Sequence, residues 1–294
     1  MKNDDKEFKY WVWYSRIAHI STLKKKKMLE KYKSPEMLYK FDKIKLSEIP
    51  ELNTDEIAEF LRPEYRLNLE KYCDYMLKNR ITMITMFDEI YPENLKNIYD
   101  GPIVLFAKGN INLLNHKSVA IVGARDCSEY GKKVSKELAY DLSKQNICII
   151  SGLAKGIDKY AHIGALEAHG KTIAVVGNGL DIIYPFDNKK IYEAIIKQDG
   201  LIISEYIIGT KPDKLNFPAR NRIISALSQG IVVVEAKSKS GALITVDFGL
   251  EHGKEIFAVP GNINNINSQG TNELIRQGAY IVCKSSDITE VLDF

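Results

Sequence analysis

Residues 118–151, SVAIVGARDCSEYGKKVSKELAYDLSKQNICIIS, predict a strand, a helix and a second strand in succession. Two short apolar runs rich in β-branched side chains, at 119–122 and 147–150, are typical of strands covered on both faces. Between them, residues 129–144 place apolar side chains at helical spacing. Because a helix that joins two parallel strands makes a right-handed crossover, this stretch indicates an α/β fold with a parallel sheet.

The same alternation continues through the rest of the chain. Further strands are expected at 172–176, 201–203, 231–234, 256–259 and 280–282. Helices are expected at 158–168, 189–197, 218–229, 243–252 and 271–277. Residues 118–294 are therefore predicted to form an extended Rossmann-like domain, with a mostly parallel sheet flanked by helices.

The region before this domain has a different pattern. Residues 1–80 predict a small all-helical N-terminal domain, because apolar side chains recur at helical spacing over 11–20, 28–32, 36–41, 54–62 and 64–79. Residues 81–117 predict a connector that packs on the main domain, with short strands at 81–86 and 103–107. The lysine run 24–27 is expected at a solvated helix start, with contact to a phosphate backbone as the alternative.

Composition and charge are those of an ordinary soluble globular protein, with 294 residues, 27% charged, 45% apolar and a net charge of +3. A net charge this small means that any surface for a polyanion must be local. The four cysteines lie far apart and lack zinc spacing, so we expect reduced thiols and no metal site. The chain has no signal-peptide core and no apolar stretch of membrane length, which predicts a cytoplasmic protein without membrane contact.

Many of the cationic and aromatic side chains follow the predicted strands. Because parallel strands end at the same edge of the sheet, the loops after them meet on one rim, where ligands bind in such folds. The sequence FPARNRII at 217–224 indicates a helix start, whose positive dipole end attracts anions, beside an aromatic ring on which a base can stack. Several phosphates spread along an extended strand would suit the cations of this rim, which are Arg125, Lys155, Lys214, Arg220 and Arg222.

Other residues of the rim have structural explanations. Gly152 and Gly156 either shape a tight turn or let a ligand approach the backbone, and the sequence leaves both possibilities open. Asp158 is expected to serve a helix N-terminus, and His162 is expected to pack in the core. Glu235 is expected to pair with a neighbouring arginine rather than to act in catalysis.

Known cofactor and catalytic patterns do not fit this rim. A dinucleotide site needs GxGxxG after the first strand, but here Gly123 is followed by Ala124 and Arg125. The sequence also lacks a serine-hydrolase elbow, a Cys/His set and a metal cluster. We therefore expect no cofactor and no catalytic residue, and the chain is predicted not to be an enzyme.

A series of motifs in fixed order closely resembles the DNA-processing protein A family, also called DprA or Smf. The motifs are VGARDCSEYG (122–131), SGLAKGID (151–158), TIAVVGNGLD (172–181), LIISE (201–205), FPARNRIISALS (217–228), VVEA (233–236), SGALIT (240–245), FAVPGN (257–262) and SQGTNELI (268–275). The upstream stretch YPENLKNIYDGPIVLFAKG (91–109) matches as well. Together with the N-terminal helices, which resemble the family's SAM-like or helix-hairpin-helix-like module, the similarity covers nearly the whole chain.

The resemblance implies a mediator that binds and protects incoming single-stranded DNA, forms a homodimer and helps to load the recombinase RecA during natural transformation. By motif position it implies DNA contacts at Arg125, Lys155, Lys214, Phe217 and Arg220, with further candidates at Asn178, Asn221, Arg222 and Ser240.

The chain departs from the family pattern in three respects. Ala124 stands where a serine or threonine is common, and Lys254 replaces a frequent arginine. The chain stops at Phe294, so the C-terminal winged-helix domain of many members is expected to be absent.

Two alternative functions come from other classes. Nucleotide-cleaving enzymes of the lysine-decarboxylase-like, cytokinin-activating type share a related sheet and carry PGGxGTxxE. Here the proline and glycine at 260–261 are separated from GTNE at 270–273, and the glutamate spacing is one residue short. The other alternative is an interaction scaffold whose basic rim only pairs with internal acids.

Overall fold

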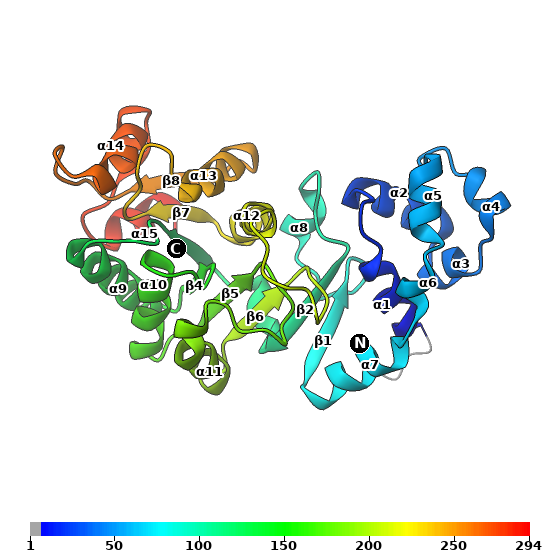
Figure 1. Cartoon of the computed structure of the whole chain (residues 1–294). Coiled ribbons are helices and arrows are strands. Elements are labelled where there is room, and N and C mark those ends of the chain that lie inside the picture. The colour runs from blue at the N-terminus through cyan, green and yellow to red at the C-terminus, as the bar shows by residue number, and fades with distance from the viewer. Residues whose placement is uncertain (1–6) are drawn as a thin grey trace.

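The computed structural model describes residues 7–294, so the first six residues of the predicted N-terminal domain lie outside the described range. A nine-stranded sheet runs through the described residues in the order β1-β2-β6-β5-β4-β3-β7-β8-β9 (Figure 1). The strands are β1 (Ile81–Thr85), β2 (Val104–Gly109), β3 (Ser118–Val122), β4 (Cys148–Ser151), β5 (Thr172–Val176), β6 (Leu201–Ser204), β7 (Gly230–Val233), β8 (Glu255–Ala258) and β9 (Tyr280–Ile281).

All pairings from β3 to β9 are parallel, which confirms the predicted α/β sheet. The strand order reverses at β3, because β4 lies on one side of it and β7 on the other. Crevices at such reversals, outside the carboxyl ends of the strands, are where open α/β sheets bind ligands. The topology therefore places a candidate site beyond the ends of β3 and β7.

Helices cover both faces of the sheet, and the alternating side chains of β3 show how the faces divide. Val119 and Ile121 pack with α9 (Glu129–Lys144), α10 (Ile157–Glu167) and α15 (Ser286–Leu292). Ala120 and Val122 pack with the opposite layer. That layer contains α8 (Glu93–Asn97), α12 (Asn216–Leu227) and α13 (Gly241–Glu251). Both faces of the strand are thus buried, as its uninterrupted apolar sequence predicts.

Two further helices complete the sheet domain, α11 (Lys189–Lys197) and α14 (Gln269–Arg276). The predicted bounds of α9 and α11 match the structure, whereas α8 and α15 were not predicted. Short 3₁₀ turns lie at Ile111–Asn115, Phe186–Asn188 and Ile266–Ser268.

The predicted connector is part of the sheet itself. β1 and β2 form an antiparallel pair, and β2 also pairs antiparallel with β6, so residues 81–109 extend the parallel sheet at one edge. Local sequence predicts these strands, but their partners lie far away in the chain.

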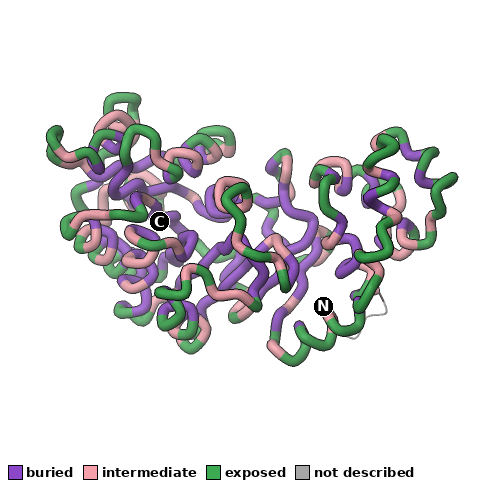
Figure 2. Tube along the Cα trace, in the orientation of Figure 1, coloured by how far each residue is buried: buried purple, intermediate pink, exposed green. Residues whose placement is uncertain are grey.

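The N-terminal helices lie beyond β1, at the end of the molecule opposite to α14 (Figure 1). They are α1 (Phe8–Arg16), α2 (Thr22–Tyr32), α3 (Pro35–Tyr39), α4 (Lys43–Ser47), α5 (Thr54–Phe60), α6 (Pro63–Arg66) and α7 (Leu69–Lys78). Trp13 and Phe60 are fully buried here, with ring centroids 5.3 Å apart. The predicted helix 64–79 is divided into α6 and α7, and α4 was not predicted. Figure 2 shows the buried backbone following the strands and the inner helices.

The prediction that the lysine run is solvated is wrong for Lys25. Its ammonium is buried and donates to the carbonyl oxygens of Tyr14 and Ile17, at the end of α1. Burial lowers the pKa of Lys25 to about 8, although Glu205 and Glu59 favour the charged form. A cation at this position satisfies carbonyl groups that have no partner within the helix.

None of the helices in residues 7–294 is both long and apolar enough to cross a lipid bilayer.

Candidate nucleic-acid interface

A cleft of about 620 Å³ opens beyond the carboxyl ends of β3 and β7, where the topology places a site. We call it the central cleft. Most of its lining comes from three segments, which are the turn 122–126 after β3, residues 214–224 before and within the first half of α12, and residues 237–245 before and at the start of α13. Ala154, Asp158 and Tyr184 complete the lining. These segments are up to about 120 residues apart in sequence, and the sheet brings them together.

Four exposed cations line the central cleft, and none of them forms an ion pair within residues 7–294. Arg125 follows β3, and Lys214 precedes α12. Lys237 and Lys239 lie in the loop between β7 and α13. Free cations on several sides of one concave surface favour a ligand with several negative charges.

An aromatic pair lies among these cations. Phe217 stacks on Tyr184 with ring centroids 5.5 Å apart and an angle of 22° between the ring planes. The guanidinium of Arg125 lies 5.3 Å from the centroid of Phe217. Phe217 is half-buried and Tyr184 is exposed, so this pair, held beside a cation, offers aromatic surface on which a nucleic-acid base can stack.

Arg220 forms the floor of the central cleft rather than its wall. Its guanidinium is buried and donates to the carbonyl oxygens of Gly152, at 2.7 Å, and Val175. Burial lowers the pKa of Arg220 to about 10, against the opposing effect of Asp158, and still leaves the group charged at neutral pH. Arg220 therefore holds the ends of β4 and β5 together and adds a fixed positive charge beneath the cleft.

The two glycines of the 152–156 turn have different structural roles. A Cβ on Gly152 would lie 2.5 Å from a guanidinium nitrogen of Arg220, so this glycine permits the close approach of that side chain. Gly156 has a φ of +75°, and a Cβ there would lie 2.1 Å from the carbonyl oxygen of Ala124. Gly156 thus shapes the turn itself.

A smaller side pocket of about 80 Å³ adjoins the cleft between Phe217 and the turn 152–155. Lys155 lies at this pocket, and its ammonium is 2.6 Å from Asp187 in an exposed ion pair. Asn178 is buried there, and its amide donates to the carbonyl oxygens of Gly179 and Ile182. Lys155 can exchange its exposed partner for a phosphate, whereas Asn178 maintains the shape of the loop.

Asn221 connects the two helices that border the cleft, and Ser240 caps one of them. The amide of Asn221 donates to the carbonyl oxygen of Gly241 at 3.4 Å. The Ser240 hydroxyl accepts from the backbone N–H of Ala242 at 3.3 Å and caps α13. Both residues line the cleft, so they order its wall and leave polar atoms at its surface.

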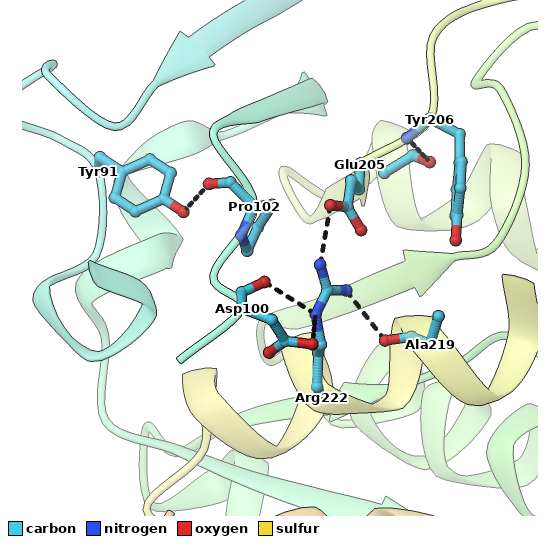
Figure 3. Close-up of polar contacts among 8 residues, drawn as sticks. Tyr91, Asp100, Pro102, Glu205, Tyr206, Ala219 and Arg222 are labelled. Carbon is cyan, nitrogen blue, oxygen red and sulfur yellow. Dashed lines mark hydrogen bonds and ion pairs between the residues drawn. The ribbon is translucent and has the colours of Figure 1, made fainter. Parts of the chain in front are cut away.

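Arg222 does not line the central cleft, in contrast to its expected role as a DNA contact. Its side chain is only 4% exposed and forms ion pairs with Glu205 at 2.8 Å and Asp100 at 3.0 Å (Figure 3). The local sequence does not show that Arg220 and Arg222 have such different surroundings. Glu205 and Asp100, which bind Arg222, lie 17 and 122 residues away from it in the chain.

The remaining polar residues of the rim have structural roles. Asp158 accepts from the backbone N–H groups of Gly152 and Ala154, so the carboxylate orders the turn before α10. His162 packs in the core as expected, and burial lowers its pKa to about 3. A metal site with three or more His, Cys, Asp or Glu ligands is not found in the described part of the chain.

The prediction that Glu235 pairs with an arginine is wrong. Its carboxylate instead accepts from the backbone N–H of Ser128, at 2.8 Å, and from the Ser128 hydroxyl. Ser128 is the N-cap of α9, so Glu235 places negative charge at a helix N-terminus, where it is stabilising.

The sequence analysis did not identify Lys237 and Lys239 as members of the site, and it assigned no role there to Tyr184. The two lysines precede the SGALIT motif and follow a strand, so their place on the rim was visible in the sequence. The stacking of Tyr184 on Phe217 depends on the fold of the 178–185 loop, which local sequence does not reveal.

Comparisons with known proteins identify relatives of this chain. The family model described as DNA recombination-mediator protein A matches residues 82–293. A DNA processing protein DprA from Streptococcus pneumoniae is 46% identical over 210 residues, which is 71% of this chain and 74% of that protein.

Solved structures extend the similarity to the fold. The X-ray structure of DprA from Streptococcus pneumoniae superposes with a TM-score of 0.84 at 36% identity, covering 97% of this chain and 98% of that one. A structure of DNA processing protein A from Helicobacter pylori, concerned with its single-stranded DNA binding mode, has a TM-score of 0.65 at 33% identity. It covers 73% of this chain and 97% of that one.

Proposed function

The chain belongs to the DNA recombination-mediator protein A family, and on that basis we propose that it binds single-stranded DNA in the central cleft. The observation that carries this proposal is the group of four free cations around the Phe217–Tyr184 pair. Cations bind the phosphates of the backbone, and the aromatic ring stacks on a base.

Single strands fit this arrangement better than duplex DNA. A base must be unstacked and unpaired before it can lie on Phe217, which is 5.3 Å from the Arg125 guanidinium. Inside a duplex the stacking surface of each base is already occupied. Since every base has such a surface and the cations contact only phosphates, the sequence preference should be small.

The predicted contact residues divide into two groups in this proposal. Arg125, Lys214 and, after leaving Asp187, Lys155 bind phosphates, and Phe217 stacks on a base. The second group, Asn178, Arg220, Asn221 and Ser240, shapes the surface and offers polar atoms or positive charge at its floor and wall.

Fluorescence anisotropy with labelled oligo-dT and a matched duplex tests the proposal. We expect tighter binding to the single strand, and a log–log salt slope of about −0.7 for each phosphate neutralised. Arg125→Ala should weaken binding and reduce the magnitude of the salt slope by about 0.7, the contribution of one phosphate. Arg276→Ala is the control, because Arg276 is exposed on α14, outside the cleft, and pairs with Glu273. Equal affinity for both DNAs would contradict the proposal.

Binding, rather than bond cleavage, is the proposed activity. The buried groups Asp158, His162 and Glu235 are engaged in structural contacts, so none of them is placed to act on a bound strand. The alternative of a nucleotide-cleaving enzyme needs the glutamate of GTNE, but Glu273 is bound to Arg276 on α14 and does not line the cleft. Release of adenine from AMP would favour that alternative.

Delivery of the strand to RecA in the cytoplasm, and a homodimer that binds it, complete the proposed function. Support for a dimer comes from the edge strand β9, where Tyr280 and Ile281 are exposed and the backbone is free to pair on one side. Sedimentation velocity should show a dimer, and Ile281→Lys should shift it to monomer. A monomeric wild-type protein would contradict this part of the proposal.

A further inference from the structure

Helix α12 presents opposite faces to two different environments. Phe217, Arg220, Asn221 and Ile224 all line the central cleft, and their i, i+3, i+4, i+7 spacing places them on one face of the helix. Arg222 is two positions from Arg220, which is about 200° around the helix. Its buried side chain therefore points away from the cleft, as its contacts confirm.

The Arg222 guanidinium joins three parts of the chain (Figure 3). Its Nη2 binds the Glu205 carboxylate at 2.8 Å, just after β6. Its Nε donates to the backbone oxygen of Asp100 at 3.1 Å and lies 3.0 Å from the Asp100 carboxylate, in the turn before β2. Its Nη1 donates to the carbonyl oxygen of Ala219, within α12 itself.

The two anchor points of this guanidinium are themselves held firmly. In the turn before β2, the hydroxyl of Tyr91 donates to the carbonyl oxygen of Pro102. A Cβ on Gly101 would lie 2.0 Å from the carbonyl oxygen of Leu95, so α8 packs directly against this turn. After β6, the backbone N–H of Tyr206 donates to the Ser204 hydroxyl at 3.0 Å. Arg222 thus connects α12 to two ordered segments.

We propose that Arg222, together with Asp100 and Glu205, is a positioning residue that fixes α12 so that Phe217 and Asn221 face the bound strand. This inference rests on the proposed function, because it concerns the same cleft. A planar guanidinium with five N–H donors can bind both acids and the Ala219 carbonyl at once, whereas a lysine ammonium cannot reproduce this geometry. The conservative change Arg222→Lys therefore removes the anchor while it keeps the charge.

Two other roles for Arg222 predict different results. If Arg222 bound a phosphate, its loss would reduce the salt slope by about 0.7. If it only stabilised the fold, the folded protein would bind DNA as tightly as the wild type, with a lower melting temperature alone. A positioning role predicts weaker binding by folded protein, with the salt slope unchanged.

The test uses Asp100→Asn and Arg222→Lys, with binding to labelled oligo-dT measured at several salt concentrations. Asp100→Asn removes one ion pair, keeps the backbone acceptor, and changes a side chain that is 46% exposed, so this variant should fold. We expect both variants to bind about tenfold more weakly, the effect of misplacing one stacked base, with the wild-type slope. Hydrogen exchange of the amides in residues 214–221 should be faster than in the wild type.

Each outcome of this experiment has a distinct meaning. Wild-type affinity in both variants, with folding confirmed by circular dichroism, would overturn the positioning role and leave the proposed function intact. A salt slope reduced by about 0.7 in a further variant, Arg222→Gln, which removes the charge, would overturn it as well, in favour of direct phosphate contact. If the wild-type protein itself does not prefer single strands, the proposed function fails. Arg276→Lys, in an exposed ion pair on α14, is the matched control and should bind as the wild type does.

Discussion

The central cleft and the start of α2 both carry several cations, but the two regions use them differently. In the cleft, Arg125, Lys214, Lys237 and Lys239 are exposed and have no acidic partner within residues 7–294. In the lysine run, Lys24 pairs with Glu56 at 2.8 Å, and Lys26 donates to the carbonyl oxygen of Lys96 at 3.1 Å. Lys25 is buried against the end of α1.

The difference shows that the density of lysines in a sequence does not identify a polyanion surface. The run 24–27 is the densest cluster of positive charge in the chain, yet the contacts of Lys24, Lys25 and Lys26 join segments of the fold. The cleft collects its cations from loops after different strands, and they remain free. Free charge on a concave surface attracts a polyanion, whereas an ammonium that is buried or bound to an acid or carbonyl oxygen of the fold is less available to one.

The largest expected effect is a pH dependence of folding stability that comes from Lys25, in the lysine run. Its pKa is lowered by burial to about 8, from 10.5, so between these values the unfolded chain binds more protons than the folded one. Stability should therefore rise with pH over this range, by about 1.4 kcal/mol per pH unit and up to about 3 kcal/mol in total. Lys25→Met removes this contribution.

Urea unfolding of the wild type and of Lys25→Met at pH 7.5, 8.5 and 9.5 measures this contribution of Lys25 to the free energy of unfolding. The difference in unfolding free energy between the two proteins, taken at each pH, isolates Lys25 from the other titrating groups. Lys24→Met is the matched control, since it makes the same change one position away, at a partly exposed lysine. A constant difference between the wild type and Lys25→Met across the series would show that Lys25 is not a buried cation.

The second effect concerns the aromatic pair of the cleft. Phe217→Ala should lose the stacking of one base, worth about 1–3 kcal/mol, and so weaken binding to oligo-dT by about 5- to 150-fold. Because no phosphate contact is lost, the salt slope should stay the same. Phe87→Ala is a suitable control, as this exposed ring contacts Trp11, outside the cleft. Equal affinity of Phe217→Ala and the wild type would exclude stacking on this ring.

The sequence predicted most strands and helices of the sheet domain and much of the rim, for reasons that are local. The bounds of α9 follow from the apolar periodicity, and Arg125 follows directly from its place after β3. What could not be predicted depends on partners remote in sequence. Glu235 meets Ser128, 107 residues away, and Arg222 meets Asp100, 122 residues away. The same reason explains why the antiparallel pairing of β2 with β6, which joins β1 and β2 to the main sheet, was missed.

The third effect tests the two lysines that sequence reasoning overlooked. Changing both Lys237 and Lys239 to glutamine should reduce the magnitude of the salt slope by up to about 1.4, if each binds one phosphate. Affinity at low salt should fall, and the loss should shrink as salt increases, because counterion release contributes less there. Anisotropy titrations from 50 to about 300 mM salt would measure both quantities. An unchanged slope would mean that the strand does not reach this wall of the cleft.

The smallest expected effect on DNA binding comes from removing two positive charges from the lysine run 24–27 instead of from the cleft. Lys24→Gln with Lys26→Gln also removes two positive charges, but these charges already bind Glu56 and the carbonyl of Lys96. Charges on the protein surface act on DNA only within about 10 Å at 0.1 M salt, so affinity should change by less than about twofold and the slope should not change. The stability of the N-terminal helices should fall slightly, since a partly exposed ion pair contributes about 0–1 kcal/mol. A slope reduced as much as in the Lys237 and Lys239 variant would place the DNA across the helical region as well. It would also remove the distinction between free and paired cations on which the proposed site depends.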